Sequence, residues 1–330
     1  MTMMKLNELI GRMKDKASQG KAAILSKRTT LSLLRATSHD SFTPPTRKHL
    51  STLLSSGDGS RATASAAVEL LMDRLQSTQN SAVALKCLIS VHHIIKHGTF
   101  ILKDQVSLCP YTGGRNYLNL SNFRDKTSSL SWKLSSWVRW YAKHVEQLLC
   151  SSRILGFFIG AATPHVVETQ EERASGLTNG DLLTEMDALL TVIEGIGKIP
   201  DPGSSEGNKL VNEIGGLVEE DGIAALNEVC VRVNELRERL GFLSFGEVVE
   251  LVYALKRLEE CSKMMMMEVS QKRRLWDSVI QLKEKVERMQ LDSDEESKTV
   301  TRHRPTHSDH FPLTLLNSVD FPPFTSTTFL

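Results

Sequence analysis

Apolar residues recur at three- and four-residue intervals along most of the chain, which is the spacing of amphipathic α-helices. In the segment 4–13, for example, four apolar side chains fall on one face: Leu6, Leu9, Ile10 and Met13. We find no persuasive strand alternation, and neither a GxGxxG motif nor P-loop spacing is present. The pattern therefore predicts an all-α protein.

Cap and break residues divide this pattern into elements. Pro44 and Pro45 restart the chain, and proline is tolerated at the first position of a helix. Ser60 and Asn80 are suited to cap the next two helices, and Gly98 is placed to close the second of them.

Later helical segments are expected at 130–149, 181–196, 208–240 and 245–290. Residues 291–330 have mixed charge, many Ser and Thr residues and no period, so we expect a disordered tail there. The expected architecture is one domain over residues 1–290, with about ten helices packed as a curved stack of helix pairs.

Composition places the chain among soluble proteins, with 40% hydrophobic and 24% charged residues. No apolar run reaches the roughly 18 residues of a membrane span, and the N-terminus has no secretory signal pattern. The five cysteines are widely spaced and never form a CxxC pair. These features favour a reducing compartment, and a cytoplasmic location is the default expectation.

Charge is distributed unequally between the two halves of the chain. Residues 1–150 carry 21 Lys and Arg against 9 Asp and Glu, a balance of +12, whereas residues 151–330 have a balance of −11. We expect the first half to face an anionic partner, either nucleic acid or an acidic membrane surface.

Three histidines, His92, His93 and His97, raise the question of a metal site, because His93 and His97 are four residues apart. No third ligand is evident and no HExxH motif is present, so a structural role is favoured. Nothing places a cysteine beside a base and an orienting acid. We therefore expect no enzyme activity, no cofactor and no metal.

Other motifs are open to two interpretations. The run Met264 to Met267 is either an adaptable binding surface or partly core. Asp181-Leu182-Leu183 is similar to a short clathrin-box sequence, but its leucines fit the apolar face of a helix and favour burial. Trp137, Trp140 and Tyr141 share one face of an expected helix, which favours core packing.

The stretch RATSHDSFTPPTRKHL, residues 35–50, concentrates basic side chains around the Pro-Pro break. Lys48 and His49 lie in the first turn of the expected helix, and Arg35 arrives from the preceding one. Unsatisfied backbone N–H groups and the helix dipole favour an anion at such a position. The alternative is a solvated charged face.

Several separated motifs resemble the ANTH domain of the clathrin-assembly adaptor family, the plant branch in particular. They are RATSHDSFTPPTRKHL, ALKCLISVHHIIKHG, NYLNLSNFRDKTSSLSWKLSSWVRWY and MDALL, and together they place the resemblance over about residues 1–290. The resemblance implies a right-handed α-helical solenoid. It also implies binding of phosphatidylinositol 4,5-bisphosphate on the cytosolic leaflet, and coupling of membrane, cargo and clathrin coat at coated pits and vesicles of the plasma membrane or Golgi.

The family's lipid motif is a lysine, nine residues, a lysine, one residue, a basic residue, then His or Tyr. Carried over, the first lysine falls on Arg35, the last two positions fall on Lys48 and His49, and the middle lysine falls on Thr46 after one extra residue. Arg47 is an auxiliary candidate. A missing lysine near an anionic surface is worth about 1 kcal/mol, so we expect weaker lipid binding rather than none.

Two partner questions remain open. The tail has none of the repeated Asn-Pro-Phe, Asp-Pro-Phe or Asp-Leu-Leu motifs of relatives, which leaves direct clathrin binding undecided. Some relatives hold a SNARE helix with their C-terminal helices; here Val248, Val249, Val252 and Leu255 either serve that role or pack the solenoid. The competing function, nucleic-acid binding by the basic half, lacks the aromatic pattern or recognition helix expected for it.

Overall fold

The computed structural model describes residues 10–19, 28–108, 116–161, 170–201, 207–264, 280–281, 283–284 and 288. Every regular element in these ranges is a helix, as the sequence predicts. Besides an N-terminal helix at residues 10–19, they are α2 (Arg28–Ala36), α3 (Arg47–Leu54), η1 (Ser55–Gly57), α4 (Arg61–Ser77), α5 (Ser81–His97), α6 (Phe100–Ser107), α7 (Ser129–Leu155), α8 (Gln170–Ser175), α9 (Asn179–Ile196), α10 (Lys209–Glu238), η3 (Leu240–Phe242) and α11 (Phe245–Met264).

Local sequence explains where the helices begin and end. The side chain of Ser60 accepts a hydrogen bond from the Thr63 amide, and Asn80 does the same for Val83, so both predicted N-caps are confirmed. Gly98 is the C-cap of α5, as predicted, but its φ of −65° is not the left-handed conformation typical of a glycine cap. Gly156, with φ of 73°, does end α7 in that conformation.

The core is built around α5, which is buried on nearly every side. Its sequence, SAVALKCLISVHHIIKH, has apolar residues around the whole helix rather than along one stripe, which is typical of a helix enclosed by others. It packs against α4, α6, α7 and α10. The polar residues Lys86, His92 and Lys96 are buried with it and therefore need partners inside the protein.

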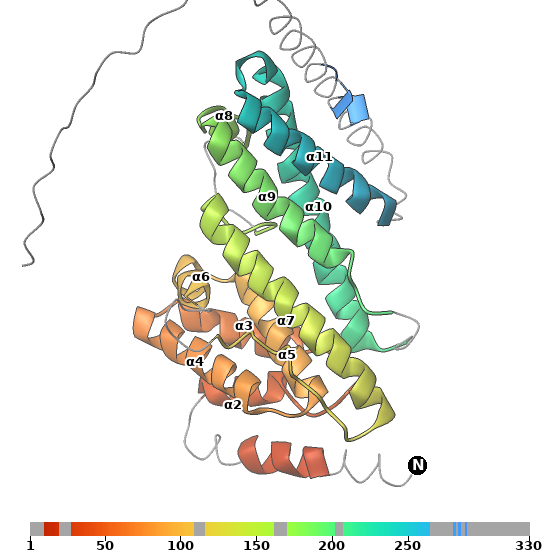
Figure 1. The fold of residues 1–330 in the computed structure, drawn as a ribbon. Helices are drawn as coiled ribbons and strands as arrows, with labels where there is room; N and C mark the ends of the chain where they lie inside the picture. Colours follow the sequence, from red (N-terminus) through yellow and green to blue (C-terminus); the bar gives the residue numbers. More distant parts are fainter. Residues whose placement is uncertain are drawn as a thin grey trace, which may run out of the picture. The chain divides into compact units, whose positions relative to one another are not determined.

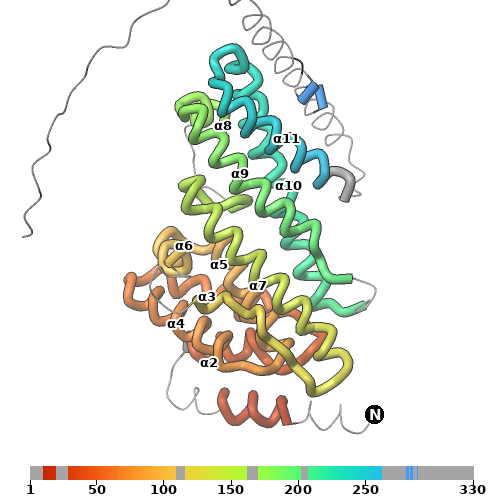
Figure 2. The backbone as a smooth tube through the Cα atoms, in the orientation of Figure 1, coloured from red at the N-terminus to blue at the C-terminus, as the bar shows by residue number. Residues whose placement is uncertain are grey.

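The remaining helices pack on one another largely in chain order (Figures 1 and 2). α7 lies between α5 and α9, and α9 in turn contacts α10 and α11. α2 packs on α3, and α4 packs on α6. This successive packing confirms the predicted helical solenoid.

The structure corrects the prediction for the Pro-Pro break. Pro44 and Pro45 both lie outside the helix: Thr46 is the N-cap and α3 begins at Arg47. Thr46 has extended backbone, with φ −73° and ψ 143°, which is typical of an N-cap residue. Arg47, Lys48 and His49 are therefore the first three helical residues.

The predictions for the end of the chain are tested only in part. α11 is helical to Met264, the first part of the predicted helix 245–290. The chain divides into two units, Met1–Glu287 and Arg288–Leu330. The predicted tail at 291–330 and the residues Met265 to Met267 lie outside the described ranges.

The N-terminal helix contacts the body through a polar face. Ile10 and Met13, predicted to share an apolar face, are exposed, whereas Gly11 and Asp15 are buried. A Cβ atom on Gly11 would lie 2.8 Å from Cβ of His39, so only glycine permits this close approach.

Candidate anion-binding site

The start of α3 leaves its first turn without a side-chain cap. The carbonyl of Thr46 accepts hydrogen bonds from the amides of His49 (3.0 Å) and Leu50 (3.1 Å), but its hydroxyl caps no amide. The hydroxyl instead lies 2.7 Å from Nδ1 of His49. The positive end of the helix dipole therefore faces a surface on which Thr46, Arg47 and Lys48 are exposed.

Arg35, on the last turn of α2, is also exposed, and its charge acts on His49 in the first turn of α3. Burial lowers the pKa of His49, and the positive charges of Arg35 and Lys48 lower it further. Because α2 packs on α3, residues that are more than ten positions apart in sequence form one group. We call Arg35, Thr46, Arg47, Lys48 and His49 the basic cluster.

The basic cluster has no acidic counterpart within the described ranges. No ion pair to Arg35, Arg47 or Lys48 occurs there, and no carboxylate contributes to the pKa of His49. Positive charge that the protein does not itself balance is available to an external anion, and a helix N-terminus adds to that attraction.

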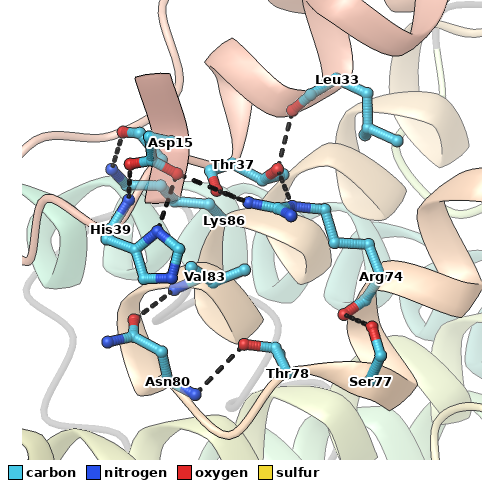
Figure 3. Close-up of polar contacts among 11 residues, drawn as sticks. Asp15, Leu33, Thr37, His39, Arg74, Ser77, Thr78, Asn80, Val83 and Lys86 are labelled. Atoms are coloured by element: carbon cyan, nitrogen blue, oxygen red, sulfur yellow. Dashed lines mark hydrogen bonds and ion pairs between the residues drawn. The ribbon is translucent and has the colours of Figure 1, made fainter. Parts of the chain in front are cut away.

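The loop that joins α2 to α3 is held in place by a network that sequence reasoning did not identify (Figure 3). Arg74 of α4 donates from Nε to Oγ1 of Thr37 (2.5 Å) and from Nη2 to the Thr37 carbonyl (2.7 Å). Thr37 donates in turn to the carbonyl of Leu33 (2.7 Å). Arg74 thereby fixes the chain directly after Arg35.

The following residues of the loop are anchored from other elements. Asp15, on the N-terminal helix, accepts from the backbone amide of His39 (2.8 Å) and lies 2.7 Å from its Nδ1. Lys86 of α5 donates to Oγ of Ser38 (3.0 Å; Figure 3). Four elements, α2, α4, α5 and the N-terminal helix, thus determine how the two sides of the basic cluster meet.

Lys86 is a buried ammonium, only 1% exposed. Burial lowers its pKa to about 8, against the raising effect of Asp40 and Asp15. Its only sequence signal is a lone lysine in the otherwise apolar stretch 82–89. The lysine stands out in the sequence, but its partner Ser38 lies 48 positions away, so the contact could not be inferred.

A cleft of about 750 Å³ adjoins this network, between the N-terminal helix, the loop and the start of α7. Its cationic lining consists of Lys14, His39 and Arg74, and Asp15 lies beside the last two. Because this carboxylate balances part of that charge, the basic cluster is the stronger candidate for binding an anion.

His92 belongs to a second group of polar side chains, which lies inside the protein. His92 is fully buried, and its Nδ1 lies 2.9 Å from the hydroxyl of Tyr141. Its Nε2 is 2.9 Å from Oδ2 of Asp221, and Nε2 of His144 is 2.8 Å from the same oxygen. Lys96 donates to the other oxygen of Asp221 (3.2 Å). We call His92, Lys96, His144 and Asp221 the buried network.

Burial alone would raise the pKa of Asp221, but the adjacent imidazoles lower it well below its usual value. Two histidines and a carboxylate are potential metal ligands. Ligands bound to zinc at about 2.1 Å would be more than 3 Å apart, however, and here Lys96 already places a positive charge on the carboxylate. The group therefore fits a hydrogen-bonded junction of α5, α7 and α10 better than a metal site.

The other predicted candidates take structural positions. His93 lies 3.6 Å from Glu213, and its ring is 5.8 Å from that of His97. Leu182 and Leu183 are buried, which confirms the core interpretation of the clathrin-box-like sequence. Trp137 and Tyr141 are likewise buried.

The apolar residues of α11 divide between core and surface. Val252 and Leu255 are buried, so they pack the solenoid, and Val248 is half-buried. Val249 is exposed and lies four residues from Phe245 and four from Tyr253, which are also exposed. These three form the apolar stripe of α11.

The profile of the ANTH domain matches residues 29–199, and this chain belongs to that family. Among its relatives is the Arabidopsis thaliana protein named "Putative clathrin assembly protein At4g40080", with 55% identity over 264 residues, which are 78% of this chain and 72% of the relative.

Two further Arabidopsis thaliana proteins, "Putative clathrin assembly protein At5g10410" and "Putative clathrin assembly protein At5g65370", are 32% and 30% identical. The aligned regions cover 77% of this chain and 77% of the first, and 79% of this chain and 91% of the second. Within the described ranges, none of the helices has the length and apolar character to cross a bilayer.

Proposed function

We propose that this protein is an adaptor in clathrin-mediated endocytosis and vesicle budding that binds phosphatidylinositol 4,5-bisphosphate and has no catalytic activity of its own. The observation that carries the proposal is the meeting of Arg35 with the uncapped first turn of α3, where Lys48 and His49 lie. The relatives named clathrin assembly proteins support extending that role to this chain.

Arg35 and Lys48 supply fixed charge to the phosphates, and His49 and the α3 amides supply hydrogen-bond donors. Arg47 is exposed at the first helical position and is an auxiliary contact. Thr46 replaces a charge with a hydroxyl, so affinity is lower by about 1 kcal/mol, roughly fivefold, than with a lysine there.

Liposome sedimentation with and without the bisphosphate lipid tests this site. Replacing Arg35, Lys48 and His49 together by Glu removes at least two favourable charges, each worth about 1 kcal/mol at an anionic surface, and should weaken binding at least thirtyfold. The matched control reverses three exposed lysines outside the cluster: Lys126→Glu, Lys133→Glu and Lys143→Glu.

The control should lose much less affinity than the cluster variant. Equal losses in both proteins would mean that net charge rather than this site drives binding. Preferential binding of RNA over liposomes at matched salt would instead favour the nucleic-acid function that the basic half of the sequence suggests.

Membrane attachment would place the protein on the cytosolic face of coated pits and vesicles. Liposomes carrying phosphatidylinositol 4-phosphate, compared with the bisphosphate, test the choice of headgroup. Clathrin binding is a separate matter, tested by pull-down of clathrin with the full chain and with residues 1–290.

The apolar stripe of α11 is the surface we propose for an amphipathic SNARE helix. Phe245 and Tyr253, 68% and 65% exposed, present apolar area at the spacing of a helix that packs on another. Phe245→Ser with Tyr253→Ser should abolish retention of a vesicle SNARE in a pull-down and leave liposome binding intact. Unchanged retention would exclude the stripe as the docking surface.

A further inference from the structure

The loop between α2 and α3 exposes a Thr-Pro sequence just before the basic cluster. Thr43 precedes Pro44 and Pro45, and its side chain is exposed. The residue before a proline favours extended backbone, and residues 43–46 belong to none of the helices. Protein kinases bind their substrate residue in an extended segment, and proline-directed kinases select a threonine or serine that proline follows. Thr43 therefore has the exposure, the backbone and the sequence that such a kinase needs.

The sequence contains one other Thr-Pro, Thr163-Pro164, and no Ser-Pro. Thr163 lies outside the described ranges. It is far from the basic cluster in sequence, whereas Thr43 lies in the loop that joins the two sides of the cluster. The second site therefore serves as an internal control for the first.

The hydroxyl of Thr43 holds the loop through Asp40. It donates to Oδ2 of Asp40, and Oδ1 of the same carboxylate accepts from the amide of Phe42 (3.0 Å). Burial raises the pKa of Asp40, but the hydrogen bonds from Thr43 and Phe42 outweigh it and keep this pKa below its usual value. A phosphate on Thr43 would remove the hydroxyl donor and place a second negative group beside Asp40. Like-charge repulsion would then open this contact.

The phosphate would also bring negative charge close to the basic cluster. Thr46, the N-cap of α3, is three positions from Thr43, so the two backbones are at most about 10 Å apart. This distance is comparable with the Debye length at physiological ionic strength, and the positive first turn of α3 attracts an anion. The cluster would receive from its own chain the counter-charge that it lacks among the described residues.

We propose that Thr43 is the target of a proline-directed kinase and that its phosphate reduces the affinity of the basic cluster for an anionic lipid surface. The kinase transfers the γ-phosphoryl group of ATP: a P–O bond to Oγ1 forms as the bond to the β-phosphate oxygen breaks, ADP leaves, and the hydroxyl proton passes to the base of the kinase. The product carries about 1.5 to 2 negative charges at neutral pH. The inference rests on the proposed function of the cluster.

Treatment of the full chain with ATP and, in separate reactions, a mitogen-activated and a cyclin-dependent kinase tests the proposal, with the modified residues identified by mass spectrometry. Binding is then measured by sedimentation with bisphosphate liposomes and by calorimetry with soluble inositol 1,4,5-trisphosphate. Thr43→Ala removes the proposed site, and Thr163→Ala is the matched control. Thr43→Glu and Thr43→Gln compare one negative charge with a neutral side chain of the same size.

Treated wild-type protein and treated Thr163→Ala should bind both ligands about ten- to thirtyfold more weakly than the untreated proteins, because up to two positive charges are offset. Thr43→Ala should bind equally with and without treatment. Thr43→Glu should bind about fivefold more weakly than Thr43→Gln, since it adds one charge. The weaker binding of the soluble trisphosphate distinguishes a change at the site from repulsion between the phosphate and a membrane.

Absence of phosphate from Thr43 after treatment with both kinases would overturn the proposed modification. Phosphate on Thr43 with unchanged affinity would overturn the proposed effect and leave the binding site intact. Failure of the untreated wild-type protein to bind the trisphosphate or bisphosphate liposomes would overturn the proposed function, and this inference with it.

Discussion

The basic cluster and the buried network use similar side chains for different purposes. Each combines lysine and histidine from separate helices, but the network surrounds a carboxylate, Asp221, and is almost completely enclosed. The cluster faces solvent, and no described carboxylate balances it. Positive charge that is balanced and buried joins helices, whereas positive charge that is exposed and unbalanced is available to a ligand.

The largest effect is expected from removing the carboxylate of the network. Asp221→Ala leaves two buried imidazoles without their carboxylate and leaves Lys96 with Glu220 (2.8 Å), an exposed side chain, as its counter-charge. The loss should cost about 3–5 kcal/mol of stability in denaturant unfolding. Glu219→Ala, an exposed carboxylate two positions away, is the control and should cost less than about 0.5 kcal/mol. A small effect for Asp221→Ala would show that the network is not a structural junction.

Arg74 is partly buried and supports the loop beside the cluster. Arg74→Met removes two hydrogen bonds to Thr37 and the nearby charge facing Asp15 (3.9 Å), and should cost about 2–4 kcal/mol. It should also weaken trisphosphate binding in calorimetry at temperatures where the variant is folded. Arg74→Lys should restore stability only in part, because lysine lacks the planar fork. Unchanged affinity in both variants would show that the loop held by Arg74 does not position the basic cluster.

Acidification should destabilise the buried helices through His93. Burial, with His92 next in effect, lowers the pKa of His93 to about 4, below the 6.5 of an unfolded chain, so the folded state resists this proton. Stability should fall by roughly 2–3 kcal/mol between pH 6.5 and 4. The stabilisation due to Asp221, whose pKa is also lowered, persists until the pH falls below about 4.

Thermal unfolding across this range should therefore show a decrease in stability that is smaller in His93→Gln than in the wild-type protein. An identical pH dependence of unfolding in wild-type and His93→Gln proteins would contradict the burial argument.

The smallest effect is expected from the hydroxyl of Thr46. Thr46→Val keeps the shape of the side chain but removes the contact to His49, which should change headgroup affinity by less than about fivefold. Thr46→Ser retains the hydroxyl and should preserve the wild-type headgroup affinity. A Ser variant that behaves like Val would show that the hydroxyl is not responsible.

Local rules predicted the helices well, because capping residues such as Ser60 and Asn80 act within three residues of their partners. They were less reliable at Pro44 and Pro45, where the proline pair precedes the N-cap instead of occupying the first turn. The apolar face of the N-terminal helix was also misleading as a guide to packing, because the body holds that helix through Asp15.

The site was predicted only in its exposed part. Arg35, Lys48 and His49 are found by motif spacing and by their place at a helix start. The residues that support them cannot be found in this way. Lys86 contacts Ser38, 48 positions away in sequence, and Arg74 contacts Thr37, 37 positions away. The same holds for His92. The sequence favours a structural role for this residue, but its partner Asp221 is 129 positions away.

Hydrogen–deuterium exchange of the full chain, free and on liposomes containing phosphatidylinositol 4,5-bisphosphate, tests the central claim most directly. We predict slower exchange in the last turn of α2 and the first turn of α3, with little change in α10, which carries Asp221. Protection of α10 or of the α11 stripe by the lipid, with none at residues 35–50, would contradict the account.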